Sequence, residues 1–311
     1  MSEERELLRA TVAALVDKHA NPEAVREAMA SDKGYDENLW QLLCEQVGAA
    51  ALIVPEELGG AGGELADAAV VLEELAKGLV PTPLLGTTLA ELALLGAGAH
   101  DPLEALSEGT SIGTVVFDAG YVLNGDIADV VIAAQDGRLS RWTDLTVTPS
   151  TSMDPTRRLA AVSAGATEDL GADPGLADTA AILMAVEQIG AASRCLDLTV
   201  AYTKDRVQFG RAIGSFQALK HRMSDMYVKI SAARAIVNDA VADPTSTNAS
   251  LARFMATEAF NAVAAESIQM HGGIAITWEH DIQLYFKRAH GSAQLLGPAR
   301  EHLRKLEATA L

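Results

Sequence analysis

The chain has 311 residues, 49% of them apolar and only 5% aromatic, and its formal net charge is −18. This composition predicts a mainly helical protein, and the length allows a sizeable core. The charge argues against nucleic acid and anionic membrane surfaces as partners, because like charges repel. The sequence has no uninterrupted run of about 18 apolar residues, and no basic stretch leads into an apolar one at its start. We therefore expect no membrane span, no signal peptide and a cytoplasmic location.

The first third of the chain has the periodicity of helices. Apolar residues recur at three- and four-residue steps over residues 7–16, and similar spacing returns over 40–52. The glycine-rich stretch 55–63 breaks this pattern, since glycine permits a tight change of direction. Residues 70–79 predict a further helix, which Gly78 ends.

From residue 111 the pattern changes to short runs rich in β-branched residues. Three of them are separated by Asp-Ala-Gly and Asn-Gly-Asp turns, and they lie at 113–117, 121–123 and 130–133. Further strands are predicted at 138–142, 145–147 and 159–162. These runs predict a small β domain in the middle of the chain.

The last section has the pattern of a helical bundle. Asp178 is predicted to cap a long helix that extends to Lys204. Apolar spacing predicts later helices at 219–241, 251–270 and 281–296, with a turn at 243–248. The expected fold is mainly α with a small β domain, and its parts are an N-terminal helical domain (1–105), a middle β domain (106–170) and a C-terminal helical bundle (171–311).

The two cysteines, Cys44 and Cys195, lie far apart in apolar helical patterns. They form either a disulfide or two buried thiols, and the helical context favours the thiols.

Two segments of the last section combine unusual residues. The first follows the predicted long helix and reads Arg206-Val-Gln208-Phe209-Gly210, with Phe216-Gln217 beyond it. An arginine at a helix end can simply complement the helix macrodipole. Together with glutamines and aromatic rings, however, it offers a guanidinium fork for phosphate oxygens, amide donors and a ring face.

The second segment ends another predicted helix and reads Gln269-Met270-His271-Gly272-Gly273. Two glycines after a helix are commonly just its C-cap. Bare backbone is also what a phosphate or ribose needs for close approach. His271 is either a ligand contact or an ordinary buried or capping histidine.

In order and spacing, the two segments resemble the C-terminal helical domain of the acyl-CoA dehydrogenase family. The order of helices, β domain and helical bundle extends this resemblance over nearly the whole chain, as does the stretch from Val54 to Gly60. The resemblance implies that both segments hold the adenosine and pyrophosphate part of FAD, whose reactive ring lies against a neighbouring subunit. The implied cofactor contacts are Arg206, Gln208, Phe209, Phe216, Gln217, Gln269, Met270, His271, Gly272 and Gly273.

The resemblance fails at two points of the family's active site. Where the family usually has a catalytic glutamate in a Glu-Gly-Thr context, this chain reads Leu295-Leu296-Gly297-Pro298, and leucine cannot act as a base. The β domain also lacks the Thr-Glu-Pro-x-Ala-Gly-Ser-type loop and the Trp-Ile-Thr-type strand that hold the isoalloxazine ring. We therefore expect no catalytic residue in this chain, and we predict no metal site.

Within the family, the chain resembles the short, non-catalytic subunit of actinobacterial α2β2 enzymes that act on steroid-derived CoA thioesters. This implies a larger partner subunit and α,β-dehydrogenation of an acyl-CoA, with FAD taking the hydride. A self-sufficient enzyme with a relocated base is one alternative, for which Glu187 and Glu279 are candidates. Hydrogen bonding at a helix interface explains Glu187 better, and a structural role explains Glu279 better. The other alternative is a non-enzymatic assembly protein that kept the fold and lost the flavin.

Overall fold

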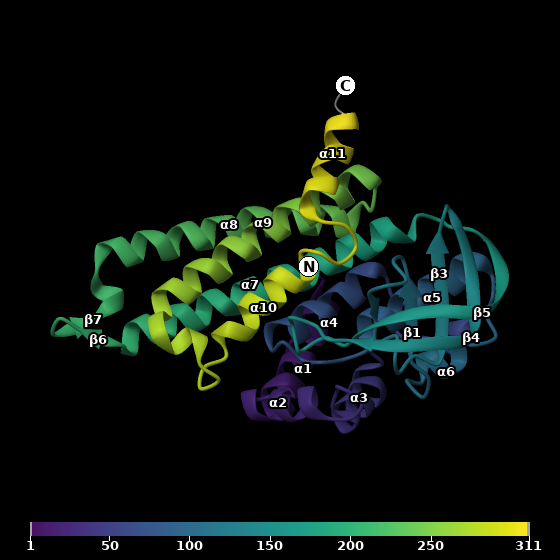
Figure 1. Ribbon diagram of the computed structural model, residues 1–311, viewed down its shortest axis with the longest axis horizontal. Helices are drawn as coiled ribbons and strands as arrows, with labels where there is room; N and C mark the ends of the chain where they lie inside the picture. Colours follow the sequence, from purple (N-terminus) through teal and green to yellow (C-terminus); the bar gives the residue numbers. More distant parts are fainter. Residues whose placement is uncertain (1, 310–311) are drawn as a thin grey trace.

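The N-terminal part of the protein is helical (Figure 1). The computed structural model describes residues 2–309. The N-terminal elements are α1 (Glu3–His19), α2 (Pro22–Ala30), α3 (Glu37–Leu42), the π-helical turn η1 (Leu43–Val47), the 3-10 turn η2 (Glu56–Leu58), α4 (Leu65–Lys77), α5 (Leu84–Ala97) and α6 (Leu103–Ser107). The side chains of Ser2, Asn21 and Asp36 cap the first three helices by accepting backbone N–H bonds.

Helix α4 ends before Gly78, as predicted, but it begins earlier than residue 70. The backbone N–H of Glu64 donates to the carboxylate of Asp67 (2.8 Å), as in a capping box. The helix therefore starts at Leu65. The apolar pattern pointed to the buried centre of the helix and missed its first turn, where residues 65–67 are only partly buried.

The middle of the chain forms a five-stranded sheet in the order β1-β3-β4-β5-β2. Its strands are β1 (Gly113–Val116), β2 (Val122–Leu123), β3 (Val130–Gln135), β4 (Arg138–Ser150) and β5 (Leu159–Ala172). The β1–β3 pair is parallel and the other pairs are antiparallel. The strands predicted at 138–142 and 145–147 are one strand, and the strand predicted at 159–162 extends to Ala172. Much of this β4–β5 ribbon is exposed. Because runs of apolar residues mark only the buried part of a strand, the full length of the two strands was not predicted.

The C-terminal part is a bundle of long helices. Its elements are α7 (Leu176–Asp205), the hairpin β6 (Val207–Gln208) and β7 (Arg211–Ala212), the 3-10 turn η3 (Ile213–Ser215), α8 (Gln217–Ala242), α9 (Ser246–His271), the 3-10 turn η4 (Gly272–Ile276), α10 (Ile282–Ser292) and α11 (Ala299–Thr309). Helix α7 is buried without interruption from Ala180 to Ala192 and packs against α4, α8 and α9. It is the central helix of the molecule.

Several predicted boundaries in the bundle are wrong. Asp178 does not cap α7: the carboxylate of Asp173 accepts from the N–H groups of Gly175 and Leu176, and Asp178 bonds the hydroxyl of Ser246. Thr245 caps α9, so that helix starts inside the predicted turn. Helix α10 ends at Ser292 instead of residue 296, and α11 was not predicted.

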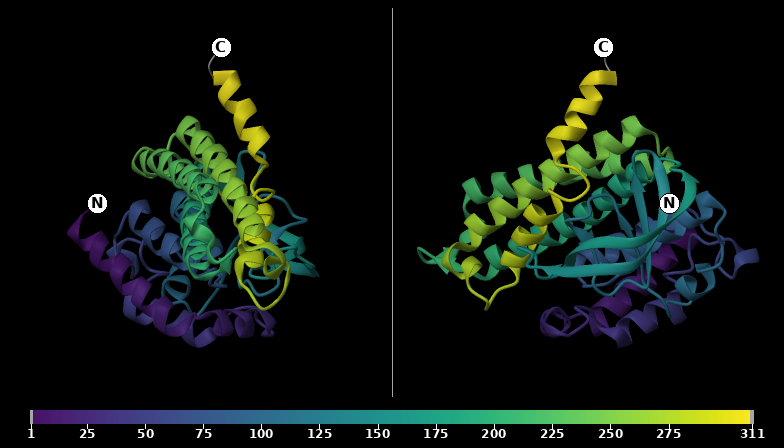
Figure 2. Two further views of the ribbon diagram at one scale, coloured as in Figure 1. Left: turned by 90° about the vertical axis from the view of Figure 1, so that its left-hand side faces the viewer. Right: turned by 45° about the vertical axis from the view of Figure 1, so that its right-hand side comes forward.

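The three groups of elements pack side by side (Figures 1 and 2). Helices α7 to α10 run lengthwise, with the β6–β7 hairpin at one tip and the five-stranded sheet at the other end. The N-terminal helices lie along one side of the bundle, and α11 projects from the body. Both cysteines are free thiols, as favoured above, with Cys195 buried and Cys44 partly buried. Within residues 2–309, no helix combines the length and apolarity needed to cross a membrane.

Candidate functional site

The first site segment forms a β-hairpin at the tip of the bundle, which the sequence did not predict. Arg206 caps the end of α7, and its carbonyl accepts the N–H of Ile213 (2.8 Å), which closes the hairpin. Phe209 and Gly210 form the two-residue turn with φ of 53° and 75°, as a type I′ turn requires. A positive φ is unfavourable for phenylalanine, and its side chain is 92% exposed. An exposed aromatic ring on a strained turn indicates a functional contact beyond the chain.

Two cations accompany these aromatic rings. The guanidinium of Arg211 stacks on the ring of Phe216 at 3.9 Å from its centroid, and Phe209 meets the same ring edge to face at 6.2 Å. In the described part of the chain, neither Arg206 nor Arg211 forms an ion pair. Unpaired guanidinium groups in a protein of net charge −18 provide a local anion site. Arg211 was missed, because only the hairpin places it on Phe216.

The second segment presents bare backbone at the end of α9. Gly272 has φ 64° and ψ −140°, a combination that favours glycine. No heavy atom lies within 4 Å of the position of a Cβ on Gly272 or Gly273, so both are open to a ligand. The hydroxyl of Tyr202 on α7 donates to the carbonyl of His271 (3.2 Å). This bond joins the ends of α7 and α9, and with them the two site segments.

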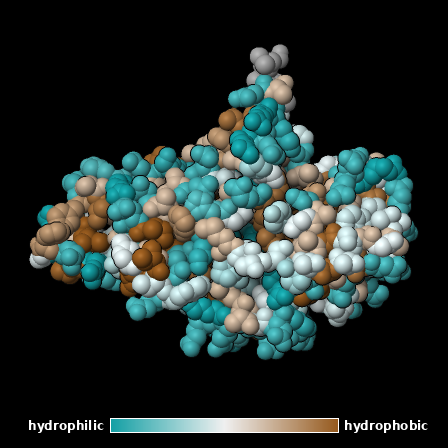
Figure 3. All heavy atoms as spheres, in the orientation of Figure 1, coloured by the Kyte–Doolittle hydropathy of each residue, from teal (hydrophilic) through white to brown (hydrophobic). Residues whose placement is uncertain are grey.

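The predicted contacts differ in accessibility. Seven are exposed, namely Arg206, Gln208, Phe209, Gln217, Gln269, Gly272 and Gly273, and Phe216 is partly buried. Met270 and His271 are only 6% and 4% exposed, so they can meet a ligand only through their backbone. Exposed apolar residues gather at the same end of the bundle, where Figure 3 shows apolar surface. This end therefore combines open backbone, cations and apolar surface, which fits a dinucleotide and a partner surface.

A cavity of about 630 Å³ lies where the sheet meets the loop between α10 and α11. Leu89, Phe117 and Leu296 are among its apolar lining residues. Leu296 has φ 60°, and its carbonyl lies 3.1 Å from Nε2 of the buried His302. Among the described lining residues, Asp118 alone carries a carboxylate, and it accepts the N–H of Gly120. The loop that carries Leu296 thus presents no base to the cavity.

Arg253 fixes the same loop from inside the bundle. Its guanidinium donates to the carbonyls of Ser292 (2.5 Å) and Leu295 (2.7 Å) and to the side chain of Gln188 (2.7 Å). All these acceptors are neutral, and burial lowers the pKa of Arg253 to about 9. The loop is therefore held rigidly in a form without a catalytic carboxylate.

The two glutamates considered as relocated bases do not line this cavity. Glu187 is buried, as its apolar helix suggested, and it pairs with Arg157 of the β4–β5 connection. A neighbouring buried pair joins Arg288 of α10 to Asp154 (2.6 Å). These contacts support the interface role of Glu187. Glu279 is exposed and forms no hydrogen bond or ion pair with the described residues.

A further buried carboxylate, that of Glu91, is not marked by any sequence pattern. Glu91 on α5 is fully buried, and neither of its carboxylate oxygens has a hydrogen-bond partner among the described residues. Burial raises the pKa of Glu91 well above its usual value, which favours the neutral carboxyl. It lies on the helix that contributes Leu89 to the cavity, but it does not line the cavity itself.

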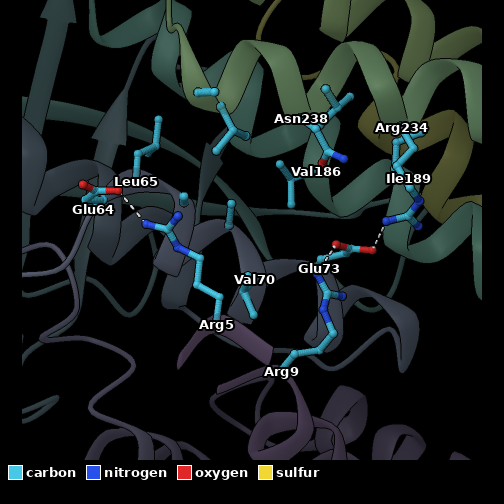
Figure 4. A pocket seen from close by; sticks show the side chains of 15 residues that line it. Arg5, Arg9, Glu64, Leu65, Val70, Glu73, Val186, Ile189, Arg234 and Asn238 are labelled. Carbon is cyan, nitrogen blue, oxygen red and sulfur yellow. Dashed lines mark hydrogen bonds and ion pairs between the residues drawn. The ribbon is translucent and has the colours of Figure 1, made fainter. Parts of the chain in front are cut away.

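A larger groove of about 750 Å³ separates the N-terminal helices from α7 and α8 (Figure 4). Its charges are already paired. Glu73 accepts from Arg9 (3.0 Å) and from Arg234 of α8, and Arg5 pairs with Glu64 and Asp67. Although burial opposes it, the two arginines hold the pKa of Glu73 below its usual value. The groove is a seam between helices, not an anion site.

Two family models match the chain. The acyl-CoA dehydrogenase N-terminal domain matches residues 2–101, and the acyl-CoA dehydrogenase C-terminal domain matches residues 176–309. The acyl-CoA dehydrogenase IpdE2 of Mycolicibacterium smegmatis is 73% identical over 99% of both chains. The chain belongs to the acyl-CoA dehydrogenase family. The family generally uses FAD, and the predicted fold class is confirmed.

Other members of the family agree with this assignment. The acyl-CoA dehydrogenase IpdE2 of Mycobacterium tuberculosis is 68% identical, over 98% of this chain and 96% of the relative. Among solved structures, a variant of the Tcur3481–Tcur3483 steroid ACAD has a TM-score of 0.91 at 26% identity, over 99% of both chains. The ChsE4–ChsE5 complex from Mycobacterium tuberculosis has a TM-score of 0.91 at 25% identity, over 100% of this chain and 98% of that one.

Proposed function

We propose that this chain is the non-catalytic subunit of a heteromeric acyl-CoA dehydrogenase, in which it binds the nucleotide half of FAD. One contrast carries the proposal. At the tip of the bundle, the guanidinium groups of Arg206 and Arg211 form no ion pair with the described residues, and the backbone of Gly272 is bare. The loop at the cavity, in contrast, carries Leu296 and no carboxylate. The chain is equipped to bind a cofactor and not to remove a proton from a substrate.

The exposed residues divide the binding task. Arg206 would bind the pyrophosphate through charge-assisted hydrogen bonds, and Phe209 and Phe216 would supply ring faces. The exposed amides Gln208, Gln217 and Gln269 would donate hydrogen bonds, while Gly272 and Gly273 let the backbone approach closely. When bound, FAD supplies a hydride acceptor for α,β-dehydrogenation of an acyl-CoA. The residues of this chain bind and orient it.

A larger partner subunit completes the enzyme in this proposal. It contributes the ring-binding loop and the catalytic glutamate, and the assembly is an α2β2 heterotetramer in the cytoplasm. The similarity to chains of the Tcur3481–Tcur3483 steroid ACAD and of the ChsE4–ChsE5 complex supports a heteromer. The first of these names also supports a steroid-derived CoA thioester as the substrate class. The strained, exposed Phe209 supports a partner surface at the bundle tip.

Cofactor content tests the proposal. This chain is purified alone and after co-expression with a candidate larger acyl-CoA dehydrogenase subunit, and FAD is measured by absorbance after denaturation. We expect flavin-poor protein alone and stoichiometric FAD in the complex. About one tightly bound FAD per chain in the pure homomer would contradict the need for a partner. A complex that is active but loses no FAD when Arg206 is replaced would contradict the binding role of this chain.

The position of the base is tested separately, because Asp118 favours a second candidate function. Its carboxylate lines the cavity, so a self-sufficient enzyme would use it as the relocated base. In the heteromer, we expect Asp118→Asn and Glu279→Gln to leave turnover within a small factor of the wild type. Loss of a true general base typically lowers turnover about a hundredfold or more. Such a loss with intact FAD content and melting temperature would place the base in this chain.

A further inference from the structure

Three aromatic rings lie behind the Gly272–Gly273 turn. Tyr202 at the end of α7 stacks on His271 at the end of α9, with centroids 4.3 Å apart and an interplanar angle of 23°. His280, which precedes α10, meets His271 edge to face at 4.6 Å and Tyr202 at 5.9 Å. The rings come from the end of α7, the end of α9 and the segment before α10. Their contacts therefore link the start of the loop after α9 to its end.

The hydrogen bonds of the two histidines select their neutral tautomers. Nδ1 of His271 lies 2.7 Å from the carbonyl of Ser267, so Nδ1 carries the proton, and the buried Nε2 has no partner among the described residues. Nδ1 of His280 accepts the N–H of Ile282 (3.1 Å), so this nitrogen carries none. Protonating His271 would bury a donor without an acceptor, and protonating His280 would break a bond at the start of α10.

Burial also opposes protonation of both histidines, whereas the carboxylate of Asp281 favours it at His280. Burial lowers the pKa of His271 and His280, and each has a cationic or titratable neighbour that lowers it further. From α2, Arg26 bonds the carbonyl of Trp278 (3.1 Å) and pairs with Asp281, so it faces His280 together with that carboxylate. Asp281 acts in the opposite direction, and Tyr202 is the titratable group that α7 contributes. A second positive charge among these rings would meet Arg26.

We propose that Tyr202, His271 and His280 form an uncharged ring stack that positions the Gly272–Gly273 turn, and that protonation of the stack releases it. The inference rests on the proposed function, in which this turn contacts the nucleotide half of FAD. The hydroxyl of Tyr202 holds the carbonyl directly before Gly272, and His280 with Arg26 holds the far end of the loop. The three ring residues are positioning residues, because the turn itself would meet the ligand.

The test is the pH dependence of FAD binding by the heteromer. The dissociation constant of FAD is measured by flavin fluorescence between about pH 5 and 7.5, the range in which histidine titrates. The neutral stack is complete above about pH 6.5, the ordinary histidine value, and is lost as the pH falls through the lowered values. We expect constant affinity above that pH and a weakening of up to about tenfold per pH unit and proton below it.

Asparagine variants separate titration from structure. In His280→Asn, the amide oxygen can still accept the N–H of Ile282 but does not titrate, and His271→Asn keeps a donor for Ser267. We expect both variants to flatten the pH profile, the double variant most, while His271→Asn also removes the ring on which Tyr202 stacks and should weaken binding at neutral pH as Tyr202→Ala does. The exposed His100 lies between α5 and α6, and His100→Asn should leave the profile unchanged.

The stacking contact has its own pair of variants. Tyr202→Ala removes the ring and the hydroxyl and should weaken FAD binding about threefold to tenfold, whereas Tyr202→Phe keeps the ring and should recover the part of this loss that stacking contributes. A pH-independent wild-type complex, or equal flattening by His100→Asn, would overturn the role of the stack while leaving the proposed function intact. If Arg206→Ala also leaves binding unchanged, the proposed function fails with it.

Discussion

The two ends of the helical bundle handle polar groups in opposite ways. At the tip, Arg206 and Arg211 form no ion pair with the part of the chain that the structure describes, and the glycine backbone is open. Near the sheet, Arg288 and Arg157 are buried in pairs with Asp154 and Glu187, and they fix the β4–β5 connection against α7 and α10. Unpaired charge at one end is available to a ligand, while paired charge at the other is already used in folding. Substitutions at the two ends should therefore affect different observables.

The largest effect is expected at the closed end. Asp154→Ala leaves the buried guanidinium of Arg288 without its carboxylate, which should lower the free energy of unfolding by about 3–5 kcal/mol. Chemical denaturation measures the change. Asp169→Ala, which breaks an exposed pair with Arg138, is the matched control and should have no resolvable effect. If Asp154→Ala lowers FAD affinity at unchanged stability, the two ends are not distinct.

The next effect is expected at the open end and on binding alone. Arg206→Ala should weaken FAD retention by the heteromer by about 1.5–3 kcal/mol, roughly tenfold to hundredfold, because it removes a charge-assisted contact to pyrophosphate. FAD content after dilution and filtration measures it. Arg138→Ala removes an exposed arginine from the sheet and should change nothing. A collapse of the melting temperature of the apo complex would show that Arg206 acts in folding instead.

Glu91 breaks the pattern of the closed end, because its buried carboxyl has no hydrogen-bond partner within residues 2–309. Glu91→Met should stabilise the protein at neutral pH by about 1–3 kcal/mol, the cost of an unsatisfied buried polar group. The raised pKa fixes the sign of the pH dependence. Below about pH 4.5, the ordinary value, ionisation adds no cost, and the free energy of unfolding falls as the pH rises from there towards the raised pKa of the folded protein. Denaturation between acidic and neutral pH should show this slope in the wild type and lose it in Glu91→Met. The exposed Glu104→Met is the control, and a slope that persists would refute the role of Glu91.

The smallest effect is expected at the turn of the hairpin. Phe209→Gly relieves the positive φ and should raise the free energy of unfolding of the isolated chain by up to about 1 kcal/mol, while FAD retention falls. Phe209→Leu keeps the strained backbone and removes only the ring. If Phe209→Gly destabilises the chain, the ring has a folding role within it, and the contrast between the two ends is weaker than described.

The helices, the small sheet and the family could be predicted from the sequence, because apolar spacing and the two motifs are local features. The sequence did not predict the β6–β7 hairpin, since strands of two residues each are too short to show an alternating pattern. Arg211 was not predicted because only the hairpin places it on Phe216, and the ring stack of Tyr202 and His280 was not predicted because its contacts form only when the ends of α7 and α9 meet. Buried pairs such as Arg288 with Asp154 join residues 134 apart in the chain, which no local pattern reveals.

Boundaries were least well predicted where exposed or partly buried residues continue an element. The exposed half of the β4–β5 ribbon and the first turn of α4 are examples, since burial does not mark them. The assignment of the ten cofactor contacts stays a prediction, sharpened by the burial of Met270 and His271 to backbone contacts at those two positions. The domain boundaries at residues 105 and 170 likewise stay predictions.

The seam at Glu73 has a consequence for synthesis on the ribosome. Its carboxylate bonds Arg9, 64 residues earlier in the chain, and Arg234, 161 residues later. At a translation rate of about 5–20 residues per second, roughly ten to thirty seconds pass between the emergence of Glu73 and that of Arg234. During this interval α1 and α4 can associate, but the surface that α7 and α8 later cover stays open. The nascent N-terminal helices thus expose an apolar surface that can aggregate. Its protection depends on chaperones or on rapid completion of the chain.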